Sequence, residues 1–343
     1  MGLAARHPDW ELVAFDNLYR RGSALNLPRL EKAGIRFVKG DVRDLAALRA
    51  VPAVDALIEC SAEPSALAGS DGETEYAVHT NLIGAYNSLE LARRDNAQFI
   101  FLSSSRVYPI RPLSALRYAA VKTRFELSRE QDVPGASAAG ISERFPLDGA
   151  RTLYGATKLA AEMLAEEYAA AFGLHTVIDR CGVIAGPWQM GKIDQGVFAF
   201  WVIHHHFGLP LRYLGYGGMG KQVRDLLHVD DLVELVDEQL SDRDRWAGFK
   251  GNVGGGYECS LSLLEATAIC RELTGNEVSI ESDRESRPGD VPIYISDCAL
   301  LQELTTWRPR RDATRVLAEI HEWVAANESR LADALLVPSQ PPT

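Results

Sequence analysis

The chain has 343 residues, of which 46% are hydrophobic and 24% charged, as in a folded protein with a sizeable core. A net charge of −11 without a basic run argues against nucleic acid as a partner, because phosphate backbones are bound chiefly by clustered Lys and Arg. The sequence contains no run of about twenty apolar residues and no signal-peptide pattern, so we expect no membrane partner and a cytoplasmic location.

The cysteines and histidines do not form a metal-binding pattern. The five cysteines are scattered without a C-x-x-C pair, so the sequence predicts neither a zinc site nor a disulfide framework. His204, His205 and His206 are adjacent, but neighbouring residues of a helix point in different directions and cannot all reach one ion. We therefore expect no metal site.

Short apolar runs alternate with helical patterns through the first half of the chain. Strands are expected at residues 11–15, 35–39, 56–59, 98–103 and 176–180. Residues 73–94 and 153–172 carry apolar side chains at helical spacing, as crossover helices between parallel strands do. The sequence therefore predicts an α/β fold with a doubly wound parallel sheet.

The remaining segments predict the domain organisation. Residues 109–150, rich in Ala, Arg and Ser, interrupt the alternation as an insertion, for which we expect a helix and an active-site loop. We expect a first domain over residues 1–185 and a smaller lobe over 186–336, some of whose segments return to the first domain. Residues 337–343 have a composition that cannot form a core, so we expect a disordered tail.

A tyrosine and a lysine are spaced for proton transfer. Tyr154 and Lys158 form Y-x-x-x-K at the start of a predicted helix, which places both side chains on one face, one turn apart. A Lys ammonium beside a phenol favours the phenolate, so Tyr154 can act as a base closer to neutral pH. Such a base can take a proton from a hydroxyl while hydride leaves the same carbon. The same spacing also occurs by chance on exposed helix faces.

Hydroxyl side chains follow the strand expected at residues 98–103. Ser103, Ser104 and Ser105 stand at its carboxyl end, where open α/β sheets place their ligands. A hydroxyl at this point can hydrogen-bond a reacting oxygen, although serine-rich turns also end strands without any such role.

The segments FLSSSRVYP and LYGATKLAAE together resemble the extended short-chain dehydrogenase/reductase superfamily, the NAD-dependent sugar-nucleotide epimerases and dehydratases. Further segments agree in family order: AFDNLYRRGSALNL, GDVRD, ECSAEPS, NLIGAYNSLE, RDLLHVDDL and RPGDVPIYISD. The resemblance implies a Rossmann-like sheet, NAD as the cofactor and a homodimer. It also implies that Ser104 is the hydroxyl residue of the catalytic triad, Tyr154 the base and Lys158 its partner, with Ser105 competing for the first role.

Acidic and polar residues at the strand ends are candidates for holding NAD. Asp16 is suited to accept hydrogen bonds from ribose hydroxyls, which favours NAD over a 2′-phosphorylated cofactor. Arg20 and Arg21 lie nearby in the sequence, so the 2′-phosphorylated cofactor stays open as the alternative. By resemblance, Asp41 and Val42 match the family's adenine contact. The full predicted cofactor set is Asp16, Asn17, Asp41, Val42, Ser61, Ala62, Glu63, Asn81, Tyr154 and Lys158.

Two arginines on family motifs are candidates for the substrate diphosphate. Arg224 and Arg287 are suited to it because a guanidinium matches phosphate oxygens and stays charged. The alternative for either is a salt bridge to Asp225 or Asp290. Lys192 and Gln195 are also expected to approach the sugar or the nucleotide base of the substrate. These two residues complete the predicted substrate-binding set.

The residues after Ser104 distinguish between two reactions. Sugar-nucleotide 4,6-dehydratases carry an Asp-Glu pair there, because eliminating water needs a further acid and base. This chain has Ser105 and Arg106 instead, which argues against dehydration. Hydride that leaves one carbon and returns to the other face of the ketone inverts that centre without net redox, so we expect an epimerase.

Within the superfamily, the segments RCGVIAGPWQMGKIDQGVF and DNLYRRGSALNLPRLE most resemble the CDP-paratose (CDP-tyvelose) 2-epimerases. This resemblance implies C2 epimerisation of a CDP-linked hexose through a transient keto sugar. The alternative within the superfamily is a UDP-sugar 4-epimerase or another sugar-nucleotide oxidoreductase.

The N-terminus leaves a hypothesis of a different class open. Superfamily members carry a first strand and a G-x-x-G-x-x-G turn that bind the cofactor pyrophosphate at a helix N-terminus. This chain begins inside that helix, so we expect the first strand and the glycine loop to be missing and two sheet edges to be unpaired. Because the other motifs look intact, we expect an upstream start; the alternative is a degenerate, non-catalytic binding protein.

Overall fold

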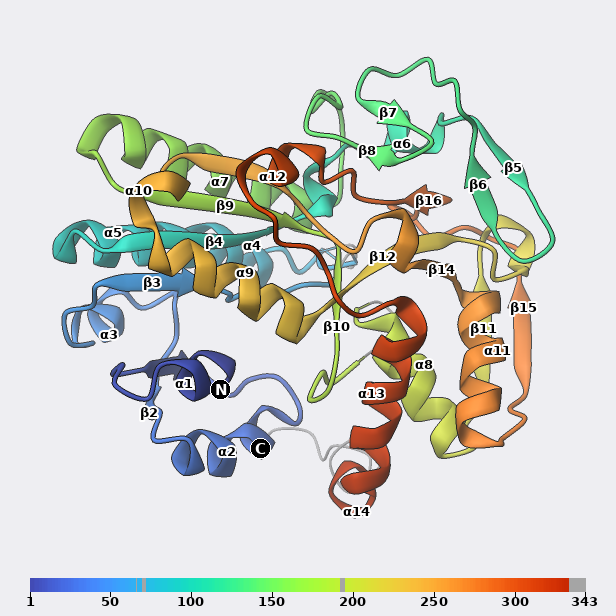
Figure 1. The fold of residues 1–343 in the computed structure, drawn as a ribbon, viewed down its shortest axis with the longest axis horizontal. Coiled ribbons are helices and arrows are strands. Elements are labelled where there is room, and N and C mark those ends of the chain that lie inside the picture. The colour runs from blue at the N-terminus through green and yellow to red at the C-terminus, as the bar shows by residue number, and fades with distance from the viewer. Residues whose placement is uncertain (66, 70–71, 192–194, 333–343) are drawn as a thin grey trace.

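A parallel sheet forms the centre of the computed structural model, which describes residues 1–332 except 66, 70–71 and 192–194 (Figure 1). Its strands lie in the order β13–β9–β4–β3. Their bounds are β3 (Ala56–Glu59), β4 (Gln98–Ser104), β9 (Thr176–Cys181) and β13 (Phe249–Val253). Every residue of β9 is buried, as expected of a strand covered on both faces.

Two further parallel strands stand apart from this sheet. They are β1 (Val13–Asp16) and β2 (Arg36–Lys39), which pair with each other. Among the described residues β1 pairs with no other strand, and the four-stranded sheet ends at β3. The parallel strands of the first half of the chain thus lie in two separate sheets.

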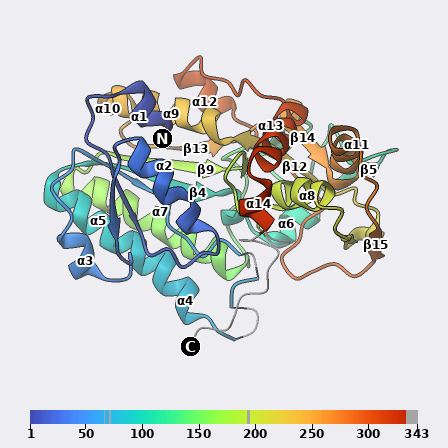
Figure 2. The same cartoon turned by 90° about the horizontal axis from the view of Figure 1, so that it is seen from below.

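Helices cover both faces of the four-stranded sheet (Figure 2). One layer contains α4 (Glu75–Val78), α5 (Gly84–Asp95) and α7 (Leu153–Phe172), and the other contains α9 (Val229–Ser241), α10 (Arg243–Trp246) and α12 (Ala299–Leu304). Neighbouring residues of β4 point to opposite faces, so Phe99 packs with Leu89 and Ala161, whereas Ile100 packs with Leu235. The predicted doubly wound α/β fold is confirmed.

The helix predicted over residues 73–94 is interrupted. A π-helical segment, η2 (His79–Ile83), joins α4 to α5 and buries Thr80 and Asn81. Such a bulge adds a residue to one turn, which changes the direction of the side chains without breaking the helix, and it is frequent at functional sites.

The first 49 residues contain three short helices. They are α1 (Gly2–Arg6), α2 (Leu27–Lys32) and α3 (Leu45–Arg49). The first packs against α9, where Arg6 donates a hydrogen bond to Glu234 (3.2 Å). Short 3₁₀ segments complete the helical elements: η1 (Ser23–Asn26), η3 (Ser105–Val107), η4 (Tyr216–Gly218) and η5 (Tyr257–Cys259).

The chain after β4 forms more structure than the helix and loop expected over residues 109–150. A short helix, α6, is followed by two antiparallel hairpins. The elements are α6 (Ile110–Ser114), β5 (Tyr118–Ala120), β6 (Phe125–Leu127), β7 (Ala136–Ser137) and β8 (Gly140–Ile141). Phe125 packs against Val223 and Ile293, so the first hairpin is anchored on strands from later in the chain.

The other segments of the second half of the chain form a smaller α/β lobe beside the sheet (Figure 1). Its strands are β10 (Val183–Ala185), β11 (Leu211–Leu214), β12 (Val223–His228), β14 (Ser260–Ser262), β15 (Ile280–Asp283) and β16 (Ile293–Tyr294). Its helices are α8 (Val197–His206), α11 (Leu263–Thr274), α13 (Ala313–Ala326) and α14 (Glu328–Leu331). No helix in the described part of the chain is long and apolar enough to cross a membrane.

A buried ion pair joins α7 to the sheet. The guanidinium of Arg180 on β9 donates to both carboxylate oxygens of Glu162 on α7, with a closest distance of 2.7 Å. Their side chains are only 2% and 1% exposed. Ser103 on β4 donates to the same carboxylate (2.5 Å), so one acidic group connects two strands and a helix.

Replacing Glu162 with Ala should lower the free energy of unfolding by about 3–5 kcal/mol, because it leaves the buried Arg180 charge without its partner. The matched control is Glu166→Ala, one turn further along α7, where Glu166 pairs with Lys250 and is 47% exposed. An exposed pair contributes about 1 kcal/mol or less, so the control should change little. Urea unfolding of the two variants measures the difference; equal losses would contradict the role given to the buried pair.

Candidate active site

The predicted triad residues meet at the carboxyl end of β4. Ser104 is the last residue of this strand, and its hydroxyl lies near enough to the phenol of Tyr154, in the first turn of α7, to lower the pKa of that phenol. Lys158 lies one turn further along the helix and donates to the carbonyl of Leu102 (2.9 Å). Sequence reasoning thus selected three residues that the fold brings together, and Ser104 rather than Ser105 contacts the tyrosine.

Local contacts set the start of α7 beside β4. The side chain of Thr152 accepts a hydrogen bond from the backbone of Gly155 (3.2 Å) and so caps the helix. A Cβ on Gly155 would lie 2.0 Å from the carbonyl oxygen of Arg106, so only glycine permits this approach. Tyr154 is therefore held against the turn that follows Ser104.

Burial dominates the electrostatics of the tyrosine. It raises the pKa of Tyr154, while the hydroxyl of Ser104 and the charge of Arg106 lower this pKa in part. Burial also lowers the pKa of Lys158, whose ammonium lies 4.4 Å from the centre of the Phe101 ring. Lys158 is not among the groups that lower the pKa of Tyr154 in this arrangement, where its ammonium is bonded to a strand carbonyl.

Four of the predicted cofactor residues gather at the ends of β1 and β2. The exposed Asp16 accepts a hydrogen bond from the backbone of Leu18 (2.6 Å), and Asn17 donates to Asp41 (3.0 Å). Arg43 bonds both carboxylate oxygens of Asp41 and holds the pKa of that carboxyl well below its usual range. Val42 follows directly, and its carbonyl accepts a hydrogen bond from the side chain of Asn87 (2.8 Å).

The other predicted cofactor residues lie between β3 and α7. The backbone of Ser61 donates to Glu59 (2.7 Å), and that of Glu63, which follows Ala62, donates to the side chain of Asn81 (2.7 Å). Asn81 in turn donates to Thr157 (3.1 Å), next to Lys158. The π-helical segment that holds Asn81 therefore ties the end of β3 to the catalytic face of α7.

The predicted substrate-binding residues differ in whether their side chains already have partners within the protein. Arg224 on β12 forms an ion pair with Asp290 (2.8 Å), which is one of the alternatives left open by the sequence. The side chain of Arg287 has no hydrogen-bond or ion-pair partner among the described residues. Gln195 bonds the guanidinium of Arg20, whereas Lys192 lies outside the described residues.

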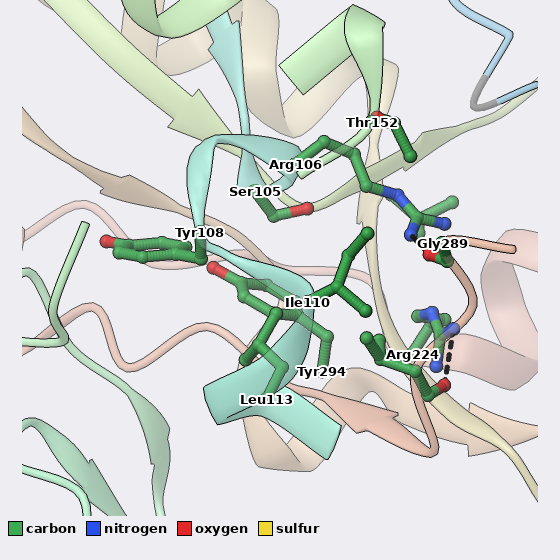
Figure 3. Close-up of a pocket in the computed structure, with 11 residues that line it drawn as sticks. Ser105, Arg106, Tyr108, Ile110, Leu113, Thr152, Arg224, Gly289 and Tyr294 are labelled. Carbon is green, nitrogen blue, oxygen red and sulfur yellow. Dashed lines mark hydrogen bonds between the residues drawn. The ribbon is translucent and has the colours of Figure 1, made fainter. Parts of the chain in front are cut away.

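A small cavity beside the triad contains a residue that sequence reasoning did not select (Figure 3). Arg106 reaches into this cavity, which has a volume of about 40 Å³. Burial and the nearby charge of Arg224 lower the pKa of Arg106 to about 10, so the guanidinium remains charged at neutral pH. The lining residues are Ser105, Arg106, Tyr108, Ile110, Leu113, Thr152, Val183, Arg224, Gly289, Val291 and Tyr294.

The three adjacent histidines have separate partners. His204 bonds the carbonyl of Pro210 (3.0 Å), and His205 bonds that of Trp201 (2.8 Å). His206 shares neither contact. In the part of the chain that the structure describes, none of the three belongs to a cluster of metal-ligating side chains.

One other group has metal-ligand geometry. Atoms of His228, Asp230 and Glu319 lie within 4.8 Å of one another. Arg311 lies 3.4 Å from Asp230 and 3.2 Å from Glu319, and Arg315 lies 2.8 Å from Glu319. Guanidinium groups therefore already pair with both carboxylates of this cluster.

Comparisons with known proteins agree with this geometry. Residues 3–254 match the family model described as NAD dependent epimerase/dehydratase family. The chain is 28% identical to a CDP-paratose 2-epimerase of Salmonella typhi over 327 residues, 92% of each chain. It is also 28% identical to a probable UDP-glucuronate 4-epimerase of Rhizobium meliloti over 270 residues, 74% of this chain and 70% of that one. A Thermus thermophilus UDP-glucose 4-epimerase, solved with NAD, has a similar fold, with a TM-score of 0.71 and 22% identity over 94% of this chain and 93% of that one.

Replacing Ser104 with Ala should shift the rising limb of the pH–activity profile to higher pH. The hydroxyl lowers the pKa of Tyr154, so its loss raises that pKa, and more alkaline solution is then needed to deprotonate the phenol. Ser105→Ala is the matched control and should leave the position of the limb unchanged. Profiles of kcat against pH for both variants test the assignment, and a shift with Ser105→Ala alone would reverse it.

Proposed function

Because the chain belongs to the NAD dependent epimerase/dehydratase family, we propose that it inverts one stereocentre of a nucleotide-linked sugar through a transient keto sugar. The meeting of Ser104, Tyr154 and Lys158 at the end of a central parallel strand is the observation that carries this proposal. The family assignment also confirms the predicted superfamily and NAD as the cofactor type.

The chain's own residues supply the proton chemistry. Tyr154 takes the proton of the sugar hydroxyl, and Ser104 holds the same oxygen in place. NAD, when bound, accepts and returns the hydride. After the keto sugar has presented its other face, the proton returns from Tyr154 and the centre is inverted, so that no net oxidation occurs. Lys158 lies one turn from the base, where its ammonium donates to the carbonyl of Leu102.

We propose that NAD lies along the strand ends that face the triad. The exposed Asp16 has a carboxylate suited to ribose hydroxyls, and Asn17, Asp41 and Val42 adjoin it. Ser61, Ala62, Glu63 and Asn81 continue this edge towards Lys158, which Asn81 approaches through Thr157. The fit rests on two groups of polar side chains: Asp16, Asn17 and Asp41 at the ends of β1 and β2, and Ser61, Glu63 and Asn81 between β3 and α7.

We propose a CDP-linked hexose as the substrate and C2 as the inverted carbon. The similarity to the CDP-paratose 2-epimerase extends over nearly the whole of both chains, which favours this choice. Ser105 and Arg106 in place of an acidic pair agree with a reaction that eliminates no water. Arg224 and Arg287 would bind the diphosphate, with Gln195 near the sugar or the nucleotide base.

A UDP-sugar 4-epimerase is the second candidate. The probable UDP-glucuronate 4-epimerase has the same 28% identity, although over a smaller share of each chain. Direct comparison of CDP-linked and UDP-linked sugars as substrates distinguishes the two candidates.

An isotope experiment tests the reaction. CDP-paratose incubated with the protein in deuterated water should give the C2 epimer without deuterium at C2, because that hydrogen returns as hydride. Tyr154→Phe should lower kcat by about 10²–10⁴-fold, since it removes the base. Tyr257→Phe is the control, because Tyr257 is 48% exposed and lies outside the site.

The other outcomes select other functions. Deuterium at the inverted carbon would contradict the hydride mechanism, and stoichiometric consumption of added NAD would indicate a net dehydrogenase. Inversion of UDP-glucuronate in place of CDP-paratose would favour the second candidate. Protein that binds a sugar nucleotide but neither holds NAD nor turns over would favour the non-catalytic binding protein.

We also propose that the protein is a homodimer. Large apolar side chains are exposed on the outer faces of η2, α5 and α7, including Ile83, Tyr86, Met163 and Phe172, of which Met163 is 60% exposed. Exposed apolar side chains on these three neighbouring helical segments suit a symmetric helix-to-helix interface. Met163→Glu should therefore convert a dimer into a monomer in light scattering, with Glu167→Gln on the same helix as control. A monomeric wild-type protein would refute this proposal.

A further inference from the structure

Arg106 carries a partly buried charge that the described protein leaves largely unpaired. Its backbone is fixed, because its N–H donates to the hydroxyl of Ser104 (3.2 Å) and its carbonyl packs against Gly155. Its guanidinium has one hydrogen-bond partner among the described residues, the carbonyl of Gly289 (2.9 Å). A guanidinium has five N–H donors, so most of its donor capacity remains for a ligand.

A second guanidinium adjoins the first. Arg106 and Arg224 are the two charged residues in the lining of the cavity, and Figure 3 shows both groups on the same side of it, close to Gly289. Arg224 is bonded to Asp290 (2.8 Å) and to the carbonyl of Val291 (2.8 Å). Asp290 balances one of the two charges, so one positive charge remains beside the cavity.

Two adjacent guanidinium groups repel each other unless an anion lies between them. Burying an unpaired charge is costly, and a planar guanidinium is best satisfied by the oxygen pair of a carboxylate or phosphate. The cavity of about 40 Å³ is large enough for a few atoms of such a group and too small for a whole sugar ring. It adjoins Tyr154, because Thr152 in its lining caps the helix turn that carries this residue.

We propose that Arg106 and Arg224 together bind one oxyanion of the substrate, a phosphoryl group or a carboxylate, in the cavity beside Tyr154. This proposal rests on the proposed function, since it names a binding group of the same site. Arg106 is then a residue that determines substrate affinity and specificity, and it adds an anion contact to the site at the position where a dehydratase carries an acid.

Binding measurements test this role separately from turnover. Calorimetric titration of the full chain, with NAD in excess, measures the dissociation constant of each probe. CDP and UDP test for a phosphoryl contact. UDP-glucuronate, compared with UDP-glucose, tests for a carboxylate contact. Arg106→Gln should weaken binding of at least one anion class by about tenfold or more, because it removes a charge-assisted contact. Arg111→Gln is the matched control, because Arg111 is exposed on α6 and does not line the cavity.

The pattern of losses identifies the anion. Equal weakening of CDP, UDP and both sugar nucleotides would assign a phosphoryl group, whereas weakening of UDP-glucuronate alone would assign a sugar carboxylate. Arg106→Lys keeps the charge without the planar donor pair, so it should recover part of the affinity and verifies that the site folds. Unchanged dissociation constants for all four probes in a folded Arg106→Gln protein would overturn the proposal. A chain that shows the losses but no epimerisation would contradict the proposed function and leave this inference standing.

Discussion

The buried pair of Arg180 and Glu162 is the constraint on which the arrangement of the active site depends. Both charges are removed from water, which costs free energy unless their contacts are nearly complete. The contacts are nearly complete here, because the guanidinium bonds both carboxylate oxygens and Ser103 adds a third donor. Moving α7 along the sheet, or rotating it, would leave one of these charges without a partner.

This constraint fixes the proposed catalytic residues because of their spacing. Tyr154, Lys158 and Glu162 follow one another at intervals of four residues, so they lie along one face of α7 with a small drift per turn. Once Glu162 is held beside Ser103 on β4, the preceding turn brings Lys158 to the carbonyl of Leu102. One turn earlier, Tyr154 meets Ser104 at the strand end, and structural and chemical roles thus share one helix face.

The sequence predicts well those features whose signals are local. The bounds of α7 agree with the predicted residues 153–172, because a capping Thr152 and a left-handed Gly173 mark its two ends in the sequence. The π-helical segment at His79–Ile83 was not predicted, since one extra residue in a turn does not disturb an apolar pattern enough to be recognised. The hairpins within residues 109–150 were also not predicted, because residues far along the chain anchor them.

The same distinction applies to the candidate site. Ser104, Tyr154 and Lys158 lie on short motifs, so their meeting could be expected from a parallel sheet and one crossover helix. The role of Arg106 depends on Gly289 and Arg224, which are more than a hundred residues away and meet it only through folding. The sequence shows a basic residue two positions after Ser104, which argues against dehydration but does not by itself indicate an anion-binding role.

The charge of Arg106 also connects binding with catalysis. Burial alone would keep Tyr154 protonated, and the two groups that lower its pKa are Ser104 and Arg106. An oxyanion between Arg106 and Arg224 would cancel part of the charge that helps the base, while a neutral substrate would leave all of it available. A positive charge at position 106 therefore strengthens the binding of an anionic group, but that anion in turn reduces the basicity of Tyr154. This trade-off is a physical reason for the residue at this position to differ between enzymes that share the same tyrosine and lysine.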